Sequence, residues 1–91
     1  IHKGTIENAY TISNGEYEVI EAEIIETSEL LSKELKNLNL PEEIRVGAVL
    51  RDNKVIIPRS SFTFKKDDKV VFIAKKDSIS FVENIFRLSS V

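Results

Sequence analysis

The chain has 91 residues, and 13 Lys plus Arg against 15 Asp plus Glu give a net charge of −2, with the two signs interleaved along the sequence. This balance argues against a general nucleic-acid surface, which needs a basic stripe. The absence of cysteine excludes disulfides and thiolate chemistry, and no apolar run approaches the roughly 20 residues that would insert into and span a bilayer.

The first part of the sequence predicts an antiparallel hairpin. Residues 5–12, TIENAYTI, are rich in β-branched and aromatic side chains, and the SNG of residues 13–15 supplies strong turn chemistry. Residues 16–25, EYEVIEAEII, then alternate along the chain. The apolar side chains that this alternation places on one face are Ile20, Ala22 and Ile24.

The pattern then changes to the spacing of a helix. Either Thr27 or Ser28 provides a capping side chain, and leucines recur at intervals of four and three residues. These leucines are Leu31, Leu35 and Leu38. The spacing predicts a short amphipathic helix that ends before Pro41.

A second hairpin is predicted in the middle of the chain. Residues 44–50, IRVGAVL, are nearly all apolar, which is typical of a strand buried on both faces. Gly47 within this run indicates a bulge or a close backbone approach. Asp52-Asn53 is a weaker turn signal than Asn-Gly, but it fits a tight two-residue turn into residues 54–57. Pro58 is expected to end this strand, because it has no N–H for a sheet ladder.

The last part of the sequence predicts one further strand and a second helix. The polar turn KKDDK precedes the strand of residues 69–74, and Asp77 or Ser78 is expected to cap the helix. The predicted inward stripe of this helix is Ile79, Phe81, Val82, Ile85 and Phe86. The fold class is therefore α+β, a small and mostly antiparallel sheet with two helices in the order β-β-α-β-β-β-α.

No set of residues predicts catalysis or a metal site. His2 is the single histidine and lies near a chain end, and no Gly-x-Ser-x-Gly or glycine-rich phosphate loop is present. Glu21 and Glu23 are typical of a solvated strand face rather than of a glycosidase pair. Asp67 and Asp68 suit turn chemistry better than a Ca²⁺ site, which takes six to eight oxygen ligands. We therefore expect a protein that is not an enzyme.

Three cations flank the second predicted hairpin: Arg51, Lys54 and Arg59. Such residues are ordinarily solvated charges that discourage strand addition at a sheet edge. Alternatively, a guanidinium beside an apolar floor suits a phosphate attached to a flat base. The residues that would form this ligand site are Arg51, Ile56, Ile57, Pro58 and Arg59.

Five ordered segments carry a family resemblance: EVIEAEI (18–24), LNLP (38–41), IRVGAVLR (44–51), VIIP (55–58), and the strand 70–73 followed by a helix ending in VENIF. In this order they resemble the TrkA-C domain family, the C-terminal domains of bacterial Trk potassium-uptake subunits and of related regulators of potassium conductance (RCK). Members commonly carry Gly-Asp in the turn before the last strand, where this chain has Asp67-Asp68. The turn must therefore form without the glycine.

The resemblance implies a domain organisation. Residues 1–14 would be a connecting strand from an upstream nucleotide-binding domain, and residues 15–91 would form the regulatory domain. Because the sequence begins at Ile1 rather than Met, we expect it to be a segment of a longer protein. NAD or ATP would bind the upstream domain, so this segment would need no cofactor of its own.

The resemblance also implies a function. It predicts a cytoplasmic domain at the inner face of the cell membrane that regulates a potassium transporter. Related domains form homodimers, and in some members the dimer interface holds cyclic di-AMP. Ligand binding or dimer rearrangement would then be coupled to transporter gating. The alternative is a cyclic-dinucleotide sensing module fused to a cation/proton antiporter or an anion transporter, where similar domains also occur.

Overall fold

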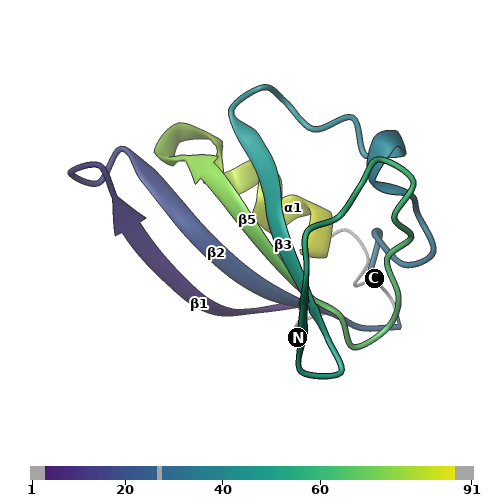
Figure 1. Cartoon of the computed structure of the whole chain (residues 1–91). Helices are drawn as coiled ribbons and strands as arrows, with labels where there is room; N and C mark the ends of the chain where they lie inside the picture. Colours follow the sequence, from purple (N-terminus) through teal and green to yellow (C-terminus); the bar gives the residue numbers. More distant parts are fainter. Residues whose placement is uncertain (1–3, 27, 88–91) are drawn as a thin grey trace.

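A single antiparallel sheet forms the frame of the molecule in the computed structural model, which describes residues 4–26 and 28–87 (Figure 1). The strand order is β1-β2-β5-β3-β4, so the last strand in the sequence lies at the centre of the sheet. Helix α1 (Ile79–Arg87) lies behind the sheet in this view and covers one face. The strands are β1 (Gly4–Ile12), β2 (Tyr17–Ile24), β3 (Ile44–Arg51), β4 (Lys54–Ile56) and β5 (Lys69–Lys75).

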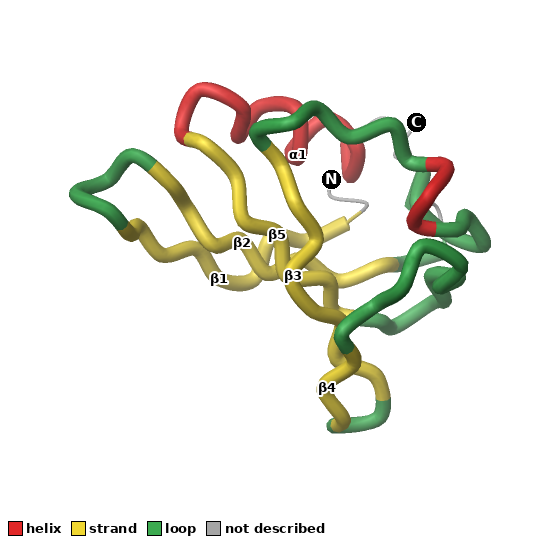
Figure 2. The backbone as a smooth tube through the Cα atoms, turned by 45° about the horizontal axis from the view of Figure 1, so that its top comes forward, coloured by secondary structure: helices red, strands yellow, loops and turns green. Residues whose placement is uncertain are grey.

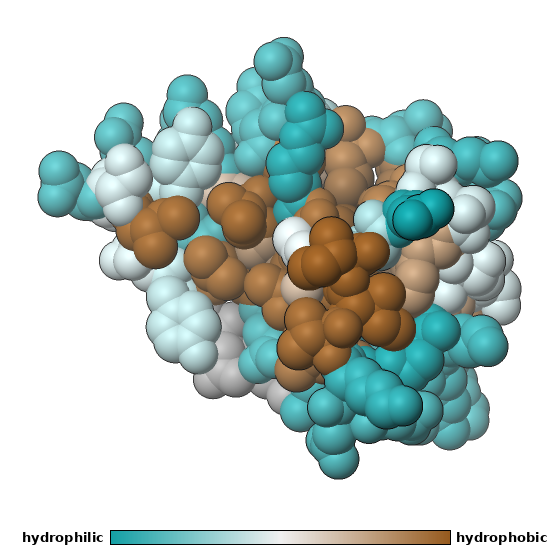
Figure 3. Space-filling model, viewed as in Figure 1, coloured by the Kyte–Doolittle hydropathy of each residue, from teal (hydrophilic) through white to brown (hydrophobic). Residues whose placement is uncertain are grey.

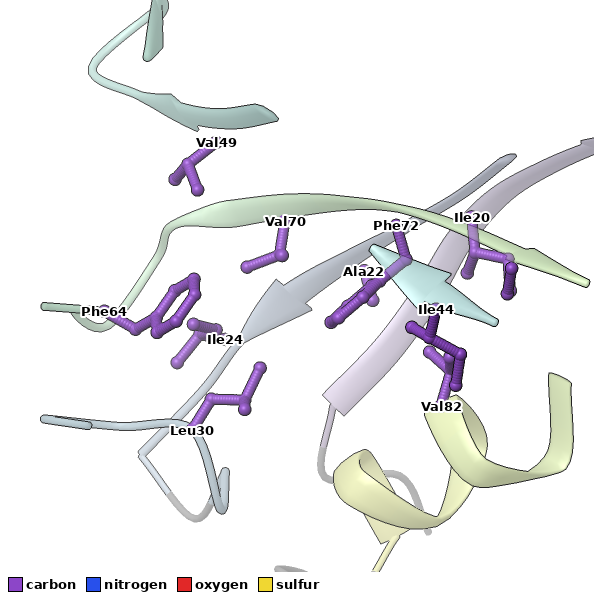
Figure 4. Close-up of a cluster of buried hydrophobic side chains, with 11 residues drawn as sticks. Ile20, Ala22, Ile24, Leu30, Ile44, Val49, Phe64, Val70, Phe72 and Val82 are labelled. Atoms are coloured by element: carbon purple, nitrogen blue, oxygen red, sulfur yellow. The ribbon is translucent and has the colours of Figure 1, made fainter. Parts of the chain in front are cut away.

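The hydrophobic core lies between the sheet and α1 and continues under the long loops. Alternation along β2 and β5 brings the core side chains together, since Ile20 is opposite Phe72 and Ala22 is opposite Val70. Val82 of α1 lies against the sheet close to Ile44 (Figure 4). The buried apolar residues are Ile20, Ala22, Ile24, Leu30, Ile44, Val49, Phe64, Val70, Phe72, Ala74 and Val82.

The predicted strands and hairpin turns are confirmed. The strand bounds agree with the sequence-based expectations to within about two residues. The predicted SNG turn forms with Ser13, Asn14 and Gly15 all in the left-handed region, at φ of 53°, 56° and 85°. Every strand pair is antiparallel, and β4 is an edge strand that ends at Ile56, just before Pro58.

The predicted helix before Pro41 is wrong. The chain forms turns there and then only a short 3-10 turn, η1 (Leu35–Asn37). Thr27, the first of the two predicted caps, lies outside the described residues. The hydroxyl of Ser28 accepts a bond of 3.2 Å from the backbone N–H of Leu30, as a capping side chain would, but turns rather than a helix follow it.

Backbone conformation explains why the leucine spacing does not form a helix. Ser32 and Asn39 have φ of 66° and 52°, which a right-handed helix cannot contain. The segment is held instead by backbone bonds to residues 60–64, including Ser32 N–H to Phe64 C=O at 2.9 Å and Leu35 N–H to Phe62 C=O at 2.9 Å. The leucines are still directed inward, because Leu30 is buried and the predicted set packs against the core.

Two burial predictions also need correction. Strand β3 is buried on one face only, because Arg45 is exposed and the neighbouring side chains on its other face are half-buried. Phe81 was expected to point inward from α1 but is 39% exposed. The side chains of Ile85 and Phe86 lie outside the described residues. The bulge predicted at Gly47 is confirmed, because the β3–β5 register shifts between Val46 and Ala48.

The turn before β5 forms without glycine because an aspartate takes the left-handed conformation. Asp67 has a φ of 73°, and its backbone N–H donates to the carbonyl of Ile24 at 2.8 Å. Aspartate tolerates this region better than most residues, although less well than glycine. The turn therefore forms with Asp67 in the left-handed conformation.

Candidate functional site

The β3–β4 hairpin projects from the edge of the sheet and carries the predicted ligand residues (Figure 2). Its turn residues Asp52 and Asn53 have φ of 52° and 63°, the pattern of a type I′ turn. Arg51 and Lys54 are consequently paired directly across the hairpin, as predicted. The hairpin thus brings two cations together at the end of the molecule that is opposite the β1–β2 turn.

Arg51 is engaged within the domain. Its Nε and Nη2 donate to the two carboxylate oxygens of Asp68 at 2.7 and 2.6 Å, a bidentate arrangement. Nη2 also donates to the carbonyl of Thr63 at 3.0 Å, and the guanidinium lies 4.7 Å from the ring centre of Phe62. Most of the hydrogen-bonding capacity of Arg51 is therefore directed toward the loop rather than toward solvent.

Asp68 is the buried half of this pair. Its side chain is only 1% exposed, and Oδ2 also accepts a bond of 2.8 Å from the backbone N–H of Lys65. The hydrogen bonding that Arg51 donates to the Asp68 carboxylate raises the pKa of Arg51 above its ordinary value, against a smaller opposing effect of burial. A buried carboxylate needs such partners, because an unpaired charge in the interior is costly. The pair therefore fixes the hairpin against the 62–68 loop.

The other predicted ligand residues differ in their exposure. Ile56 is half-buried and packs against the core, opposite Val49. Ile57 is 73% exposed, Pro58 is half-buried, and Arg59 is exposed without a side-chain hydrogen bond or ion pair to any residue of the described ranges. We call the partly exposed residues that follow β4 the hairpin rim: Ile57, Pro58 and Arg59.

Apolar side chains gather on the face of the sheet opposite α1, as Figure 3 shows, among charged residues that the register places on the same face: Glu21, Glu23, Arg45 and Lys69. The strand register places Tyr10, Val19 and Ile73 in one cross-strand row on this face. Tyr10 is 60% and Val55 68% exposed. We call this surface the open face, and its apolar residues are Tyr10, Ile12, Tyr17, Val19, Leu50, Val55, Val71 and Ile73.

Neither a metal centre nor a membrane-spanning helix is found in residues 4–26 and 28–87. No group of three or more His, Cys, Asp or Glu side chains is placed to hold a metal ion in this part of the chain. No helix there is both long and apolar enough to cross a bilayer. A cavity of about 330 Å³ lies beside the first half of β3 and contains none of the predicted ligand residues.

Sequence reasoning missed Asp68 and Phe62 as partners of Arg51. Asp68 was interpreted as turn chemistry only, and it is separated from Arg51 by 17 residues. The signal that could have found it is its position directly before a central strand, where a buried carboxylate needs a cation. Phe62 carried no signal, since an aromatic side chain in a polar loop is ordinarily part of the core.

Comparison with known proteins identifies relatives over nearly the whole chain. Residues 19–87 match the family model of the TrkA-C domain. The chain is 36% identical to the "Trk system potassium uptake protein TrkA" of Azorhizobium caulinodans over 98% of this chain and 19% of that protein. It is 38% identical to a "TrkA homolog" of Archaeoglobus fulgidus over 70% of this chain and 15% of that protein. The chain thus spans about a fifth of the length of these relatives or less.

Solved structures share the fold. The chain is similar to the "GsuK RCK domain", with a TM-score of 0.78, 11% identity, and coverage of 93% of this chain and 19% of that chain. It is also similar to a structure described as an "RCK domain with cda", with a TM-score of 0.60, 15% identity, and coverage of 76% and 97%. At these identities the likeness shows an RCK-like fold alone.

Proposed function

The chain belongs to the TrkA-C domain family, and on this premise we propose that it is a non-enzymatic regulatory module of a Trk-type potassium-uptake system. The named relatives are Trk potassium-uptake proteins, which favours this system over an antiporter or anion-transporter fusion. The module would act at the cytoplasmic side of the membrane, attached to a transporter subunit through other domains of the full-length protein.

The observation that best supports the proposal is the open face, because two copies of the domain could associate through it. Surfaces that collect exposed aromatic and branched side chains in this way are typical of protein interfaces. Two copies packed through this face would remove Tyr10, Tyr17 and Ile73 from water. A change in the pose of two such domains would then be passed to the transporter. A ligand can drive that change only through different affinities for the two poses.

We place the regulatory ligand on the hairpin rim. Ile57 and Pro58 would offer an apolar surface to a base, and Arg59 would pair with a phosphate. Arg51 would position the rim through Asp68 rather than meet the ligand with a free guanidinium, and Ile56 would support it from the core side. The ligand proposed for this site is cyclic di-AMP, as expected from the family resemblance.

Sedimentation equilibrium of the 91-residue chain tests the proposal, repeated with cyclic di-AMP and with AMP as the control. The expected result is a dimer that cyclic di-AMP strengthens and AMP does not. Arg59→Gln should abolish the ligand effect, whereas Lys54→Gln on the same hairpin should leave it unchanged. A dimer that ignores both nucleotides would remove the ligand site from the proposal, and a monomer at all concentrations would overturn self-association.

A further inference from the structure

The turn between β1 and β2 carries the single Asn-Gly pair of the sequence, Asn14-Gly15. The turn extends beyond the rest of the sheet (Figure 1), Asn14 is exposed, and Gly15 is half-buried. In such a pair the backbone nitrogen of the glycine can approach the carboxamide carbon of the asparagine, because the glycine has no β-carbon to obstruct it. The pair is therefore suited to a reaction within the chain.

The reaction converts the Asn14 side chain without a cofactor or an oxidant. The Gly15 nitrogen gives its proton to a solvent base and attacks Cγ of Asn14. As the N–Cγ bond forms, the Cγ–Nδ2 bond breaks, and Nδ2 leaves as ammonia with a proton from water. Water then opens the succinimide ring, at Cγ to give aspartate or at the backbone carbonyl carbon to give isoaspartate. The net change is one amide and one water to one carboxylic acid and one ammonia.

The folded turn slows this reaction but does not prevent it. Asn14 has a φ of 56°, and it must leave this left-handed conformation before its Cγ can meet the Gly15 nitrogen. Two backbone bonds oppose the movement, Gly15 N–H to Ile12 C=O at 3.1 Å and Glu16 N–H to Ser13 C=O at 3.2 Å. Both are near the long end of the range for such bonds. An exposed turn held in this way opens at a lower free energy than the whole domain.

Conversion would change the charge at this end of the molecule. A hollow of about 290 Å³ lies beside the turn, and its lining residues are Asn14, Gly15, Glu16, Lys75, Lys76 and Asp77. The Lys76 N–H donates to the carbonyl of Glu16 at 2.9 Å, which holds η2 (Lys76–Ser78) against the turn. The two lysines of the lining balance its two carboxylates. A third carboxylate at position 14 would make the lining net negative.

We propose that Asn14 is a site of spontaneous conversion to aspartate and isoaspartate in the folded domain, and that the conversion destabilises the β1–β2 hairpin. Isoaspartate adds a carbon atom to the backbone of a turn that sets Ile12 opposite Tyr17. Both of these residues belong to the open face. The site shares no residue with the hairpin rim and does not depend on the regulatory role proposed above.

Timed incubation of the folded 91-residue chain in neutral buffer tests the proposal, followed by peptide mapping with mass spectrometry. Asn53 is the internal control, because it has a φ of 63° in a similar two-residue turn but is followed by Lys54. Asn14 should convert at least about tenfold faster than Asn53, since a β-carbon on the next residue obstructs the attack. The chain unfolded in guanidinium chloride should convert faster still at Asn14.

Reciprocal variants separate the glycine from its surroundings. Gly15→Lys should lower the rate at Asn14 to about that of Asn53, and Lys54→Gly should raise the rate at Asn53 at least about tenfold. Lys54→Gly keeps the test decisive if Gly15→Lys does not fold, since Gly15 has a φ of 85°.

Three results would overturn the proposal. The first is an equal rate at Asn14 and Asn53 in the folded chain. The second is no conversion of Asn14 in the folded chain over a period in which the unfolded chain converts completely. The third concerns stability: the converted chain, separated by ion exchange, should unfold at a lower urea concentration than the original chain, and an unchanged midpoint would contradict the effect on the hairpin.

Discussion

Arg51 at the end of β3 and Asp68 before β5 are joined by two parallel hydrogen bonds of 2.7 and 2.6 Å, with the carboxylate almost completely buried. The pair connects the edge hairpin to the residue that precedes the central strand β5. It also determines which cations remain for ligands, since Arg59 and Arg45 have no such partner in the described chain. Arg51, one of the two arginines predicted for the anion site, thus has a structural role.

Removing Arg51 should therefore destabilise the fold. We expect Arg51→Met to lower the free energy of unfolding by about 2–4 kcal/mol, because Asp68 would be left buried with only the Lys65 N–H as partner. Urea unfolding followed by circular dichroism measures the effect. Lys66→Gln is the control, since its ion pair with Glu26 is exposed and should contribute nothing measurable.

A double-mutant cycle with Asp68→Leu measures the interaction free energy between Arg51 and Asp68. If the link is as described, Arg51→Met combined with Asp68→Leu should cost clearly less than the sum of the two single changes, because the double variant leaves no unpaired buried charge. Additive losses would mean that the two side chains stabilise the fold independently, and the role assigned to the pair would then be wrong.

Asp67→Gly should stabilise the turn before β5. Asp67 has a φ of 73°, and relief of this conformation outweighs the greater flexibility of glycine in the unfolded chain. The expected gain is about 0.5–1 kcal/mol in urea unfolding. Asp77→Gly is the matched control, because Asp77 has no positive φ and the same change should be neutral or destabilising. Equal effects at both positions would contradict the strain assigned to Asp67.

The strands could be predicted from the sequence because their signals are local. The alternation of Ile20, Ala22 and Ile24 and the turn residues Asp52 and Asn53 specify faces and reversals without knowledge of distant contacts. Sheet order is different, since β5 inserts between β2 and β3, and this is a long-range pairing that local patterns do not encode. The strands were therefore correct, whereas the helix before Pro41 and the burial of both faces of β3 were not.

The candidate site was less predictable for the same reason. Whether Arg51 is free depends on Asp68, and sequence separation says nothing about which of many carboxylates a cation will meet. The cavity beside the first half of β3 depends on two segments that do not pair with each other. Such a feature has no motif, and one of the two leucines that line it, Leu35, was assigned to a helix face.

The open face should be the surface through which copies associate. Ile73→Lys places a charge at its centre on β5 without disturbing the core, since Ile73 is already 38% exposed. We expect the dimer dissociation constant from sedimentation equilibrium to rise at least tenfold, because burying an unpaired ammonium in an apolar interface is costly. Ser80→Lys on the exposed side of α1 is the control and should leave association unchanged. Unchanged association of the Ile73→Lys variant would place the interface elsewhere.

Ser32 distinguishes the observed loop from the helix that the leucine spacing predicted. In the left-handed conformation with a φ of 66°, Ser32→Gly should be more stable than Ser32→Ala by about 1 kcal/mol. In a helix the order would reverse, because alanine exceeds glycine by about 1 kcal/mol in helix propensity. Urea unfolding of the two variants gives the sign directly. The control is the same pair of variants at the exposed neighbour Lys33, which has no positive φ and should favour alanine. A preference for glycine at Ser32 alone would show that the left-handed conformation is confined to Ser32.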